Sequence, residues 1–586
     1  MAAVVLVPAR GGSKGLPRKN MRTVGGLSLT ARAVLVGRRF AAGWRLADAA
    51  VVVDTDDEAI AQEGRRFGAE VPFLRAPALA QDDTPTAESV LGCIDRLSAV
   101  GRPFDAVILL QPTSPLRTPA DVAACWRRFD PFAAPSVVAV TPTEHPAALV
   151  VRMDGRGGLD WSGGSAGGGV RRQDVPPSYR IAGSVYVSTV ASLRSHGTFV
   201  VPGTSVGVVI PAEHALDVDS ATDLAVADAW RRIASAATPT VAVGTKRIGG
   251  GAPCYLIAEA GVNHNGDPNL AHRLVDVAAD SGADAVKFQT FTPERLASAG
   301  AMQASYQAAN TGVVESQLAM LRRLALPAEH YPLLKAHAEE RGLTFLSSPF
   351  DEQSADFLEA LGVPAFKIPS GELTNLPFLA HVARKGRPML VSSGMSTLAE
   401  VAEALLTIES HGNSPVALFH CVTSYPTRPD QCNLAAMATM RAAFGYPVGW
   451  SDHTEGTDVS VVAASLGAEM IEKHFTLDRS LPGPDQQASL EPAEFSCLVA
   501  SVRRVEAARG TGEKMPVAAE LECAELVRKS LHAKSALEGG HRLRAEDLVA
   551  LRPGGGLPPA ALVRVVGRRL RIGVTAGTML REEDLE

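Results

Sequence analysis

The chain has 586 residues, of which 46% are hydrophobic and 20% are charged, and its formal net charge is −6. This length exceeds one hydrophobic core and predicts several domains, while the slight acidity argues against a general nucleic-acid binder. No stretch reaches the roughly 18–20 apolar residues of a membrane span, and the chain starts with a strand pattern rather than a signal peptide. The seven cysteines include no CxxC pair, so neither a disulfide framework nor a structural zinc site is favoured. We expect a cytoplasmic protein with no nucleic-acid or membrane partner.

The first 232 residues alternate apolar strand patterns with helical patterns. This alternation predicts an α/β domain of Rossmann-like type with a mostly parallel sheet, and such sheets bind ligands at the carboxyl ends of their strands. Residues 233–241 follow as a linker. The predicted strands cover 3–7, 50–53, 106–110 and 136–140, and the predicted helices cover 28–40, 86–100 and 119–129.

A basic, bent loop follows the first strand. The stretch "VPARGGSKGLPRKN" at 7–20 holds Arg10, Lys14, Arg18 and Lys19 among glycines and a proline. It contains no G-x-x-x-x-G-K-[ST] pattern, which disfavours an ordinary ATPase. The loop is either a phosphate site or a solvated basic turn.

Three further blocks of the first domain carry polar residues. They are "LLQPTSPLR" at 109–117, "RRQDVPPSYRIAGSVYV" at 171–187 and "ALDVDSATDL" at 215–224. Asp217 and Asp219 are two residues apart, so on a strand they would share one face and suit a hard cation such as magnesium. The alternative is that both aspartates serve helix capping and turn formation.

Together these blocks resemble the N-acylneuraminate cytidylyltransferase family over about residues 1–230. The resemblance implies a nucleotidyltransferase in which the anomeric hydroxyl of a sialic acid attacks the α-phosphate of CTP and pyrophosphate leaves. It implies these roles: Arg10, Lys14, Lys19 and Asn20 at the triphosphate, with Arg10 and Lys19 catalytic; Asp82 and Ser89 at the nucleotide; Gln111, Thr113, Arg172 and Arg180 at the sugar acid; and Asp217 and Asp219 holding magnesium.

Eight short apolar runs alternate with helical segments in the middle of the chain. This arithmetic predicts a (β/α)8 TIM barrel, which we place at 242–514 and whose active site would lie where the strands end. The runs cover 255–257, 285–288, 344–346, 365–368, 389–391, 416–419, 447–449 and 469–472.

Each of these runs ends in polar or ionisable residues. Lysines and serines suit a phosphate group, two histidines suit a divalent metal with open positions, and two glutamates can orient hydroxyls or move a proton. A phosphorylated substrate beside a metal-polarised carbonyl suggests carbon–carbon bond formation. The strand ends include Glu259, Lys287, Gln289, Ser348, Lys367, Ser370, Glu372, Ser392, Tyr425, Ser451, His453 and His474.

The motifs "IAEAGVNHNGD", "AVKFQTF", "KIPSGE", "GWSDHT" and "EKHFTLDRSLPGPD" strongly resemble the sialic acid synthase family. The resemblance implies condensation of phosphoenolpyruvate with the open-chain aldehyde of an N-acylhexosamine such as N-acetylmannosamine, with release of phosphate. It implies these roles: Lys287, Lys367, Ser348, Ser370, Ser392 and Ser451 at phosphoenolpyruvate; His453 and His474 as ligands of manganese or another divalent metal and as catalytic residues; Glu259, Gln289, Asn310, Tyr425 and Asp485 at the sugar; and Glu372 in proton handling.

The last part of the chain loses the alternation. We place a linker at 515–527 and a small β-rich domain at 528–586, which resembles the antifreeze-like SAF (β-clip) domain of the same family. The resemblance implies that this domain swaps onto a partner's barrel and inserts Arg552, which gives a homodimer or a higher oligomer.

Two alternatives stay open. The same motifs would serve another nonulosonic acid of legionaminic, pseudaminic or deaminated neuraminic type, because one acyl group or hydroxyl changes only a few side chains. One half of the chain could instead be a non-catalytic binding or regulatory module.

Overall fold

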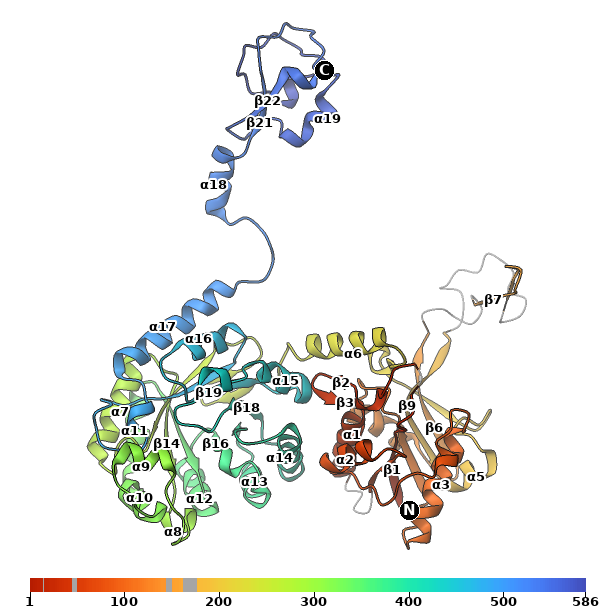
Figure 1. Cartoon of the computed structure of the whole chain (residues 1–586), viewed down its shortest axis with the longest axis vertical. Coiled ribbons are helices and arrows are strands. Elements are labelled where there is room, and N and C mark those ends of the chain that lie inside the picture. The colour runs from red at the N-terminus through yellow and green to blue at the C-terminus, as the bar shows by residue number, and fades with distance from the viewer. Residues whose placement is uncertain (14, 45–49, 144–149, 162–176) are drawn as a thin grey trace. The chain divides into compact units, whose positions relative to one another are not determined.

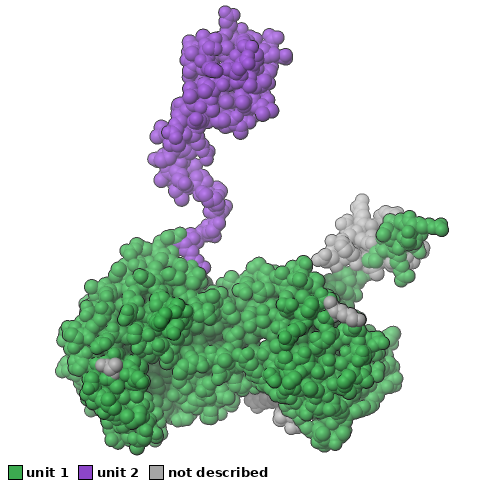
Figure 2. Space-filling view, viewed as in Figure 1, with its two compact units in different colours: residues 1–508 green, residues 509–586 purple. Residues whose placement is uncertain are grey.

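The computed structural model describes residues 1–586 except 14, 45–49, 144–149 and 162–176. The chain divides into two compact units, Met1–Ala508 and Arg509–Glu586 (Figure 2). The first unit contains the predicted sheet domain and the predicted barrel, and the second contains the small terminal domain (Figure 1). Within the described ranges, no helix combines the length and the apolarity that crossing a membrane requires.

The amino-terminal domain is built on a six-stranded sheet in the order β10-β6-β9-β5-β1-β4. It confirms the Rossmann-like prediction, although β9 runs antiparallel to both β5 and β6, which we had not predicted. The strands are β1 (Ala3–Pro8), β4 (Val51–Asp54), β5 (Ala106–Leu110), β6 (Ser136–Pro142), β9 (Tyr179–Thr189) and β10 (Val206–Val209). The helices are α1 (Leu29–Gly43), α2 (Glu58–Arg66), α3 (Thr86–Ala99), α4 (Pro119–Arg128), α5 (Val190–His196) and α6 (Ala221–Ala234).

Among the described residues of this domain, two small hairpins lie outside that sheet. The first joins β2 (Thr23–Val24) to β3 (Leu27–Ser28) directly after the basic loop, and its turn is Gly25–Gly26, both with positive φ. The second joins β7 (Val151–Met153) to β8 (Leu159–Trp161).

The barrel contains eight parallel strands in the order β15-β14-β13-β20-β19-β18-β17-β16, and β15 also lies against β16. All eight predicted strands are confirmed, and helices surround them (Figure 1). The strands are β13 (Tyr255–Gly261), β14 (Ala285–Thr290), β15 (Thr344–Pro349), β16 (Phe366–Ile368), β17 (Met389–Ser392), β18 (Val416–Cys421), β19 (Val448–Asp452) and β20 (Met470–His474). The helices are α7 (Pro268–Asp280), α8 (Pro293–Leu296), α9 (Ser305–Thr311), α10 (Gln317–Leu324), α11 (Tyr331–Glu340), α12 (Glu352–Leu361), α13 (Leu376–Ala383), α14 (Leu398–His411), α15 (Ala435–Phe444), α16 (Asp458–Ser465) and α17 (Pro492–Arg509).

A hairpin of β11 (Val241–Val243) and β12 (Lys246–Ile248) precedes the first barrel strand. Its apolar residues Val241, Val243 and Ile248 pack into one buried cluster with inward-facing barrel residues such as Ile257 and Leu346. The barrel part therefore begins with this hairpin.

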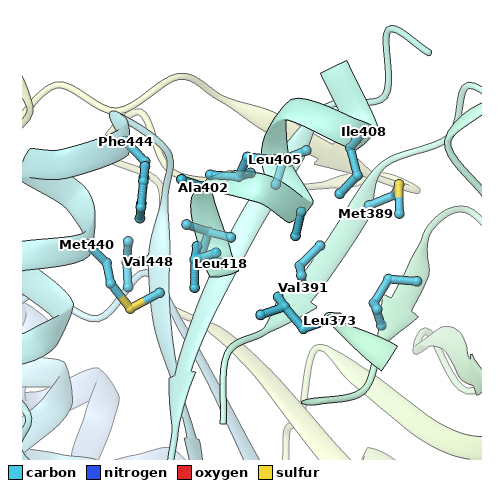
Figure 3. Close-up of a cluster of buried hydrophobic side chains, with 14 of the residues drawn as sticks. Leu373, Met389, Val391, Ala402, Leu405, Ile408, Leu418, Met440, Phe444 and Val448 are labelled. Atoms are coloured by element: carbon cyan, nitrogen blue, oxygen red, sulfur yellow. The ribbon is translucent and has the colours of Figure 1, made fainter. Parts of the chain in front are cut away.

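A second apolar layer lies between the strands and the helices. Figure 3 shows side chains of β17, β18 and β19 packed against those of α14 and α15. These contacts fix neighbouring strands relative to one another and so fix the polar residues at the strand ends. Labelled members are Leu373, Met389, Val391, Ala402, Leu405, Ile408, Leu418, Met440, Phe444 and Val448.

The second unit has its own small core, which includes Leu531, Leu543, Leu557, Val565 and Leu570. Its elements include α18 (Ala518–Val527), β21 (Ser530–Ala533), β22 (Leu548–Leu551) and α19 (Leu562–Val565). The segment 515–527, which we predicted as a linker, contains α18. That helix has no buried residue, so it does not contribute to a hydrophobic core.

Candidate active sites

Strand alternation explains why the polar residues of the barrel gather at one end. Side chains two residues apart lie on the same face of a strand. Ile257, Ala285, Leu346, Ala365, Leu390 and Met470 all belong to the interior apolar cluster. Two residues after each comes a polar one: Glu259, Lys287, Ser348, Lys367, Ser392 and Glu472. The barrel therefore has an apolar layer inside and a polar layer next to its carboxyl-end rim.

Four buried charges form the centre of that polar layer. Lys287 Nζ lies 2.7 Å from Glu259 Oε2 and 3.7 Å from Glu472 Oε2, and Lys367 Nζ lies 3.0 Å from Glu472 Oε1. None of the four side chains is more than 7% exposed. Burial raises the pKa of Glu259, and Lys287 opposes that shift. Burial also acts to raise the pKa of Glu472, but its two lysines outweigh it and the pKa is lowered.

Serines complete this charge cluster. Lys287 Nζ donates to Ser348 Oγ at 3.1 Å, and Ser451 Oγ donates to Glu472 Oε1 at 3.2 Å. Ser392 Oγ is buried and has no hydrogen-bond partner among the described residues. Because buried polar groups are normally bonded, such an orphaned hydroxyl indicates a place for a ligand atom.

Glu472 is a central residue that the sequence analysis did not single out. Its signal was nevertheless present, because Glu472 stands two residues before His474 and two after the apolar Met470 on β20, so all three share the inner face.

The rings of His453 and His474 lie together, with centroids 5.6 Å apart. His453 Nδ1 donates to the carbonyl oxygen of Val422 at 2.8 Å, which leaves Nε2 with its lone pair. Burial lowers the pKa of His453 to about 4, and burial and His453 together lower that of His474 well below its usual value. Both imidazoles are therefore neutral, as metal ligands must be.

The donor set fits a divalent metal with open positions. His474 Nδ1 is buried and unpartnered within the described part of the chain. The described residues hold no group of three or more His, Cys, Asp or Glu arranged for a metal ion. Two imidazoles would thus leave most coordination positions to water and substrate oxygens.

Aromatic rings form a wall beside the two histidines. The ring of Tyr425 lies 4.2 Å from that of His453 and stacks on Tyr306 at 5.1 Å. Asp485 is 9% exposed, and burial raises its pKa to about 6. Asn310 Nδ2 donates to the carbonyl oxygen of Pro484 at 2.7 Å. Tyr306 belongs to this wall and was missed, because nothing in its local pattern distinguishes it from a core tyrosine.

Glu372 and Ser370 lie on a short turn, Ser370–Glu372, after β16. Ser370 Oγ accepts from the backbone N–H of Gly394 at 3.0 Å and lies 3.1 Å from Cys421 Sγ. Glu372 accepts from Asn375 Nδ2 at 2.7 Å, and burial raises its pKa. Gln289 Nε2 donates to Glu259 Oε1 at 3.4 Å, which joins it to the charge cluster.

The second site is a cavity of about 340 Å³ in the amino-terminal domain. It brings together nine predicted residues from five separate stretches of sequence. Among them, Arg10 pairs with Asp82 at 2.8 Å, and Lys19 pairs with Asp219 at 2.9 Å. The nine are Arg10, Lys19, Asn20, Asp82, Ser89, Gln111, Thr113, Asp217 and Asp219.

Asp217 and Asp219 do not lie on a strand, so the shared strand face considered in the sequence analysis does not apply to them. Residues 216–219 form an irregular segment before α6. Ser220 and Asp223, rather than the two aspartates, make the capping box of that helix. Burial raises the pKa of Asp217. The two carboxylates still line one cavity, because the chain turns there toward Lys19 and Thr113.

A further charged residue lines this cavity, and three predicted residues are not found in its described lining. Arg75 lines it and forms a buried 2.8 Å ion pair with Asp54 at the end of β4, a contact that the sequence analysis missed. The predicted residue Arg180, on β9, is not among the residues that line this cavity, and it donates to the carbonyl oxygen of Ala215 at 3.0 Å. Lys14 and Arg172 lie outside the described residues.

Comparison with known proteins adds three family matches. Residues 274–514 match the model described as the NeuB family, residues 4–121 match Cytidylyltransferase, and residues 528–586 match the SAF domain.

Individual relatives match about half of this chain and nearly the whole of their own length. The chain is 46% identical over 347 residues to the N,N'-diacetyllegionaminic acid synthase of Legionella pneumophila, across 58% of this chain and 98% of that protein. It is 42% identical over 329 residues to the N,N'-diacetyllegionaminic acid synthase of Campylobacter jejuni, across 56% and 98%. A solved N-acetylneuraminic acid (sialic acid) synthetase from Leptospira borgpetersenii is 33% identical, with a TM-score of 0.45, and covers 49% of this chain and 96% of that one.

Proposed function

Since the chain belongs to the NeuB family and carries a cytidylyltransferase domain ahead of it, we propose that it makes and then activates one nonulosonic acid. The acid synthase and the cytidylyltransferase are consecutive in chemistry, because the acid formed by the first is the acceptor of the second. The proposed first reaction condenses phosphoenolpyruvate with an acylated hexosamine and releases phosphate. The proposed second reaction transfers CMP from CTP and releases pyrophosphate.

The proposed acid is of legionaminic type, formed from a 6-deoxy-2,4-diacetamidohexose. Two relatives named as N,N'-diacetyllegionaminic acid synthases, at 46% and 42% identity, support this choice. Sialic acid, formed from N-acetylmannosamine, is the second candidate, supported by the 33% identical sialic acid synthetase.

In the barrel, the buried lysines would hold the anionic groups of phosphoenolpyruvate, with the four serines Ser348, Ser370, Ser392 and Ser451 around them. C3 of phosphoenolpyruvate attacks the aldehyde carbon, water adds at C2, and the C2–O bond to phosphate breaks. His453 and His474 would hold manganese or another divalent metal, which polarises the aldehyde when bound. Glu472 pairs with Lys287 and Lys367 and holds both in place, and we assign proton transfer to Glu372.

On the sugar side, Tyr425 and Asp485 would contact the open-chain substrate next to the histidines. Asn310, Gln289 and Glu259 are assigned to its hydroxyl and acylamino groups. The stacked rings of Tyr425 and Tyr306 offer an apolar face beside Asp485, which suits a substrate with methyl and acetamido groups better than one rich in hydroxyls.

In the amino-terminal cavity, Arg10, Lys19 and Asn20 would line the triphosphate, with Asp217 and Asp219 holding magnesium. The sugar hydroxyl oxygen attacks the α-phosphorus, and pyrophosphate carries its electron pair away. Positive side chains fixed around the phosphates favour the departing charge. Gln111, Thr113 and Arg180 are assigned to the carboxylate and hydroxyls of the acid.

One observation carries the proposal: two lysines, two carboxylates and two neutral imidazoles occupy one dry end of a barrel. The test is phosphate release by the purified protein with phosphoenolpyruvate, Mn²⁺ and a panel of hexoses. We expect the 6-deoxy-2,4-diacetamidohexose to give a higher kcat/KM than N-acetylmannosamine. Absence of phosphate release with every acylated hexose would reject the proposal.

We also propose that the terminal domain contributes Arg552 to the barrel of a partner chain, in a homodimer or larger assembly. Arg552→Ala should then slow phosphate release and leave CMP transfer unchanged. Normal condensation by this variant would remove the arrangement.

A further inference from the structure

We propose that a phosphate-sized oxyanion binds in a second cavity of the first unit, held by the guanidinium groups of Arg32, Arg39, Arg117 and Arg231. This cavity has a volume of about 110 Å³. None of the four arginines lines the 340 Å³ cavity assigned to the nucleotide. The site is therefore additional to both proposed catalytic sites.

The four arginines come from three parts of the fold. Arg32 and Arg39 lie on α1, Arg117 follows the loop after β5, and Arg231 lies on α6. These three parts are more than 70 residues apart in the sequence, so the four arginines do not form one local cluster of basic residues. A solvated basic face would not require the chain to bring such distant cations together.

Backbone carbonyl oxygens accept some of the hydrogen bonds that Arg32, Arg117 and Arg231 can donate. Arg32 Nε donates to the carbonyl oxygen of Val24 at 2.6 Å, and Arg231 Nε donates to that of Ala442 at 2.7 Å. Arg117 Nη1 donates to the carbonyl oxygens of Gln111 at 2.9 Å and Ser184 at 2.7 Å. Carbonyls orient the three groups but carry no negative charge.

Negative partners are scarce around the cavity. Arg39 pairs with Glu409 through Nε and Nη2. Arg32, Arg117 and Arg231 form no ion pair with any residue that the structure describes. Asp228 and Asp121 act on Arg32 and Arg117 only as more distant charges.

Donors remain for a ligand. Arg117 is 4% exposed, and its Nε is buried with no hydrogen-bond partner in the described structure. Arg32 is 7% exposed, and no described residue bonds its Nη1. A buried cation without a counter-charge is costly, and a buried donor without an acceptor adds to that cost.

The arginines also repel one another. Burial and then Arg231 lower the pKa of Arg32 to about 9, and burial and then Arg39 lower the pKa of Arg231. An anion placed among them would reverse both effects.

The size and donor set point to a small tetrahedral oxyanion. Guanidinium forks match the paired oxygens of phosphate, and 110 Å³ is about a third of the volume of the cavity assigned to the nucleotide. Under the proposed function, one reaction of this chain releases phosphate itself, so the ion would be at hand. The anion site depends on that function only for the source of its ligand.

The test is calorimetric titration of the full-length protein with inorganic phosphate at constant ionic strength. Saturating phosphoenolpyruvate and CTP, without sugar, fill the proposed catalytic sites. We expect one phosphate to bind per chain, and Arg231→Gln to weaken that binding at least tenfold. The matched control is Arg232→Gln, whose side chain is exposed and pairs with Asp228; it should bind like the unaltered chain.

Equal phosphate affinity in Arg231→Gln and Arg232→Gln, or no binding at all, would overturn the proposal. If Arg231→Gln does not fold, Arg39→Gln replaces it, since the side chain of Arg39 is 25% exposed. If phosphoenolpyruvate and CTP fail to bind, extra phosphate sites should appear equally in every variant. A loss confined to the cavity arginines would then still identify this site while the proposed function fails.

Discussion

The two candidate active sites hold similar charges in opposite surroundings. In the barrel, Lys287 is 3% exposed and its partner Glu259 is 2% exposed. In the amino-terminal cavity, Lys19 is 16% exposed and its partner Asp219 is 74% exposed. The dry site suits small anionic substrates, because charges interact strongly where the dielectric is low, whereas the open site suits a large, highly charged triphosphate. The difference predicts that substitutions in the barrel affect both folding and rate, while those in the cavity affect rate alone.

The largest expected effect is the separation of the two activities. His453→Ala removes one of the two proposed metal ligands, so phosphate release should fall at least about 10³-fold, while CMP transfer to added acid continues. The measurement is parallel phosphate and pyrophosphate release by one preparation. Loss of both activities with an unchanged circular dichroism spectrum would show that the two sites are not independent.

Removing a buried cation should destabilise the barrel. Lys287→Met leaves Glu259 without its partner and Glu472 with only Lys367, which should cost about 3–5 kcal/mol of unfolding free energy. Urea denaturation measures this change. The matched control is Lys246→Met, which breaks an ion pair with Asp284 whose lysine is 47% exposed and should cost about 1 kcal/mol or less.

The open cavity should respond in rate. Lys19→Ala should lower CMP transfer about 10²-fold, because one fixed positive donor is lost from the proposed triphosphate site, and phosphate release should not change. Arg22→Ala is the control, since Arg22 is exposed and outside the cavity lining.

Rising salt should slow CMP transfer more than condensation, because exposed charges are screened more than buried ones. Equal salt sensitivity of the two reactions would show that the charges of the two sites do not differ in their screening by solvent.

The smallest effect concerns pH. Burial raises the pKa of Asp485 from 3.8 to about 6, so the folded chain holds this proton more tightly than the unfolded chain does. The stabilising contribution is complete below about pH 4 and is lost as the pH rises through about 6. Compared with Asp485→Asn, the unaltered protein should lose about 2–3 kcal/mol over that interval. Parallel pH profiles of the two unfolding free energies would show that Asp485 is not buried as described.

Much of this molecule was predictable from local patterns. The eight barrel strands and most strand-end residues follow from the period of two along a strand. Glu472 follows the same period of two on β20, but the sequence analysis selected only His474 from that strand. The reversed direction of β9 has no local signal, because it depends on where a long connection returns the chain. Likewise, the spacing of Asp217 and Asp219 predicts a shared face only on a strand, and the irregular segment they occupy lines the cavity by another route.

The tether between the two catalytic halves is short. Helix α6 ends at Ala234 and the hairpin below the barrel begins at Val241, and the six residues 235–240 can span at most about 20 Å. The linker therefore keeps the two halves close to each other. An acid released by the barrel then has a higher effective concentration at the amino-terminal cavity than it would have if the two halves were separate polypeptides.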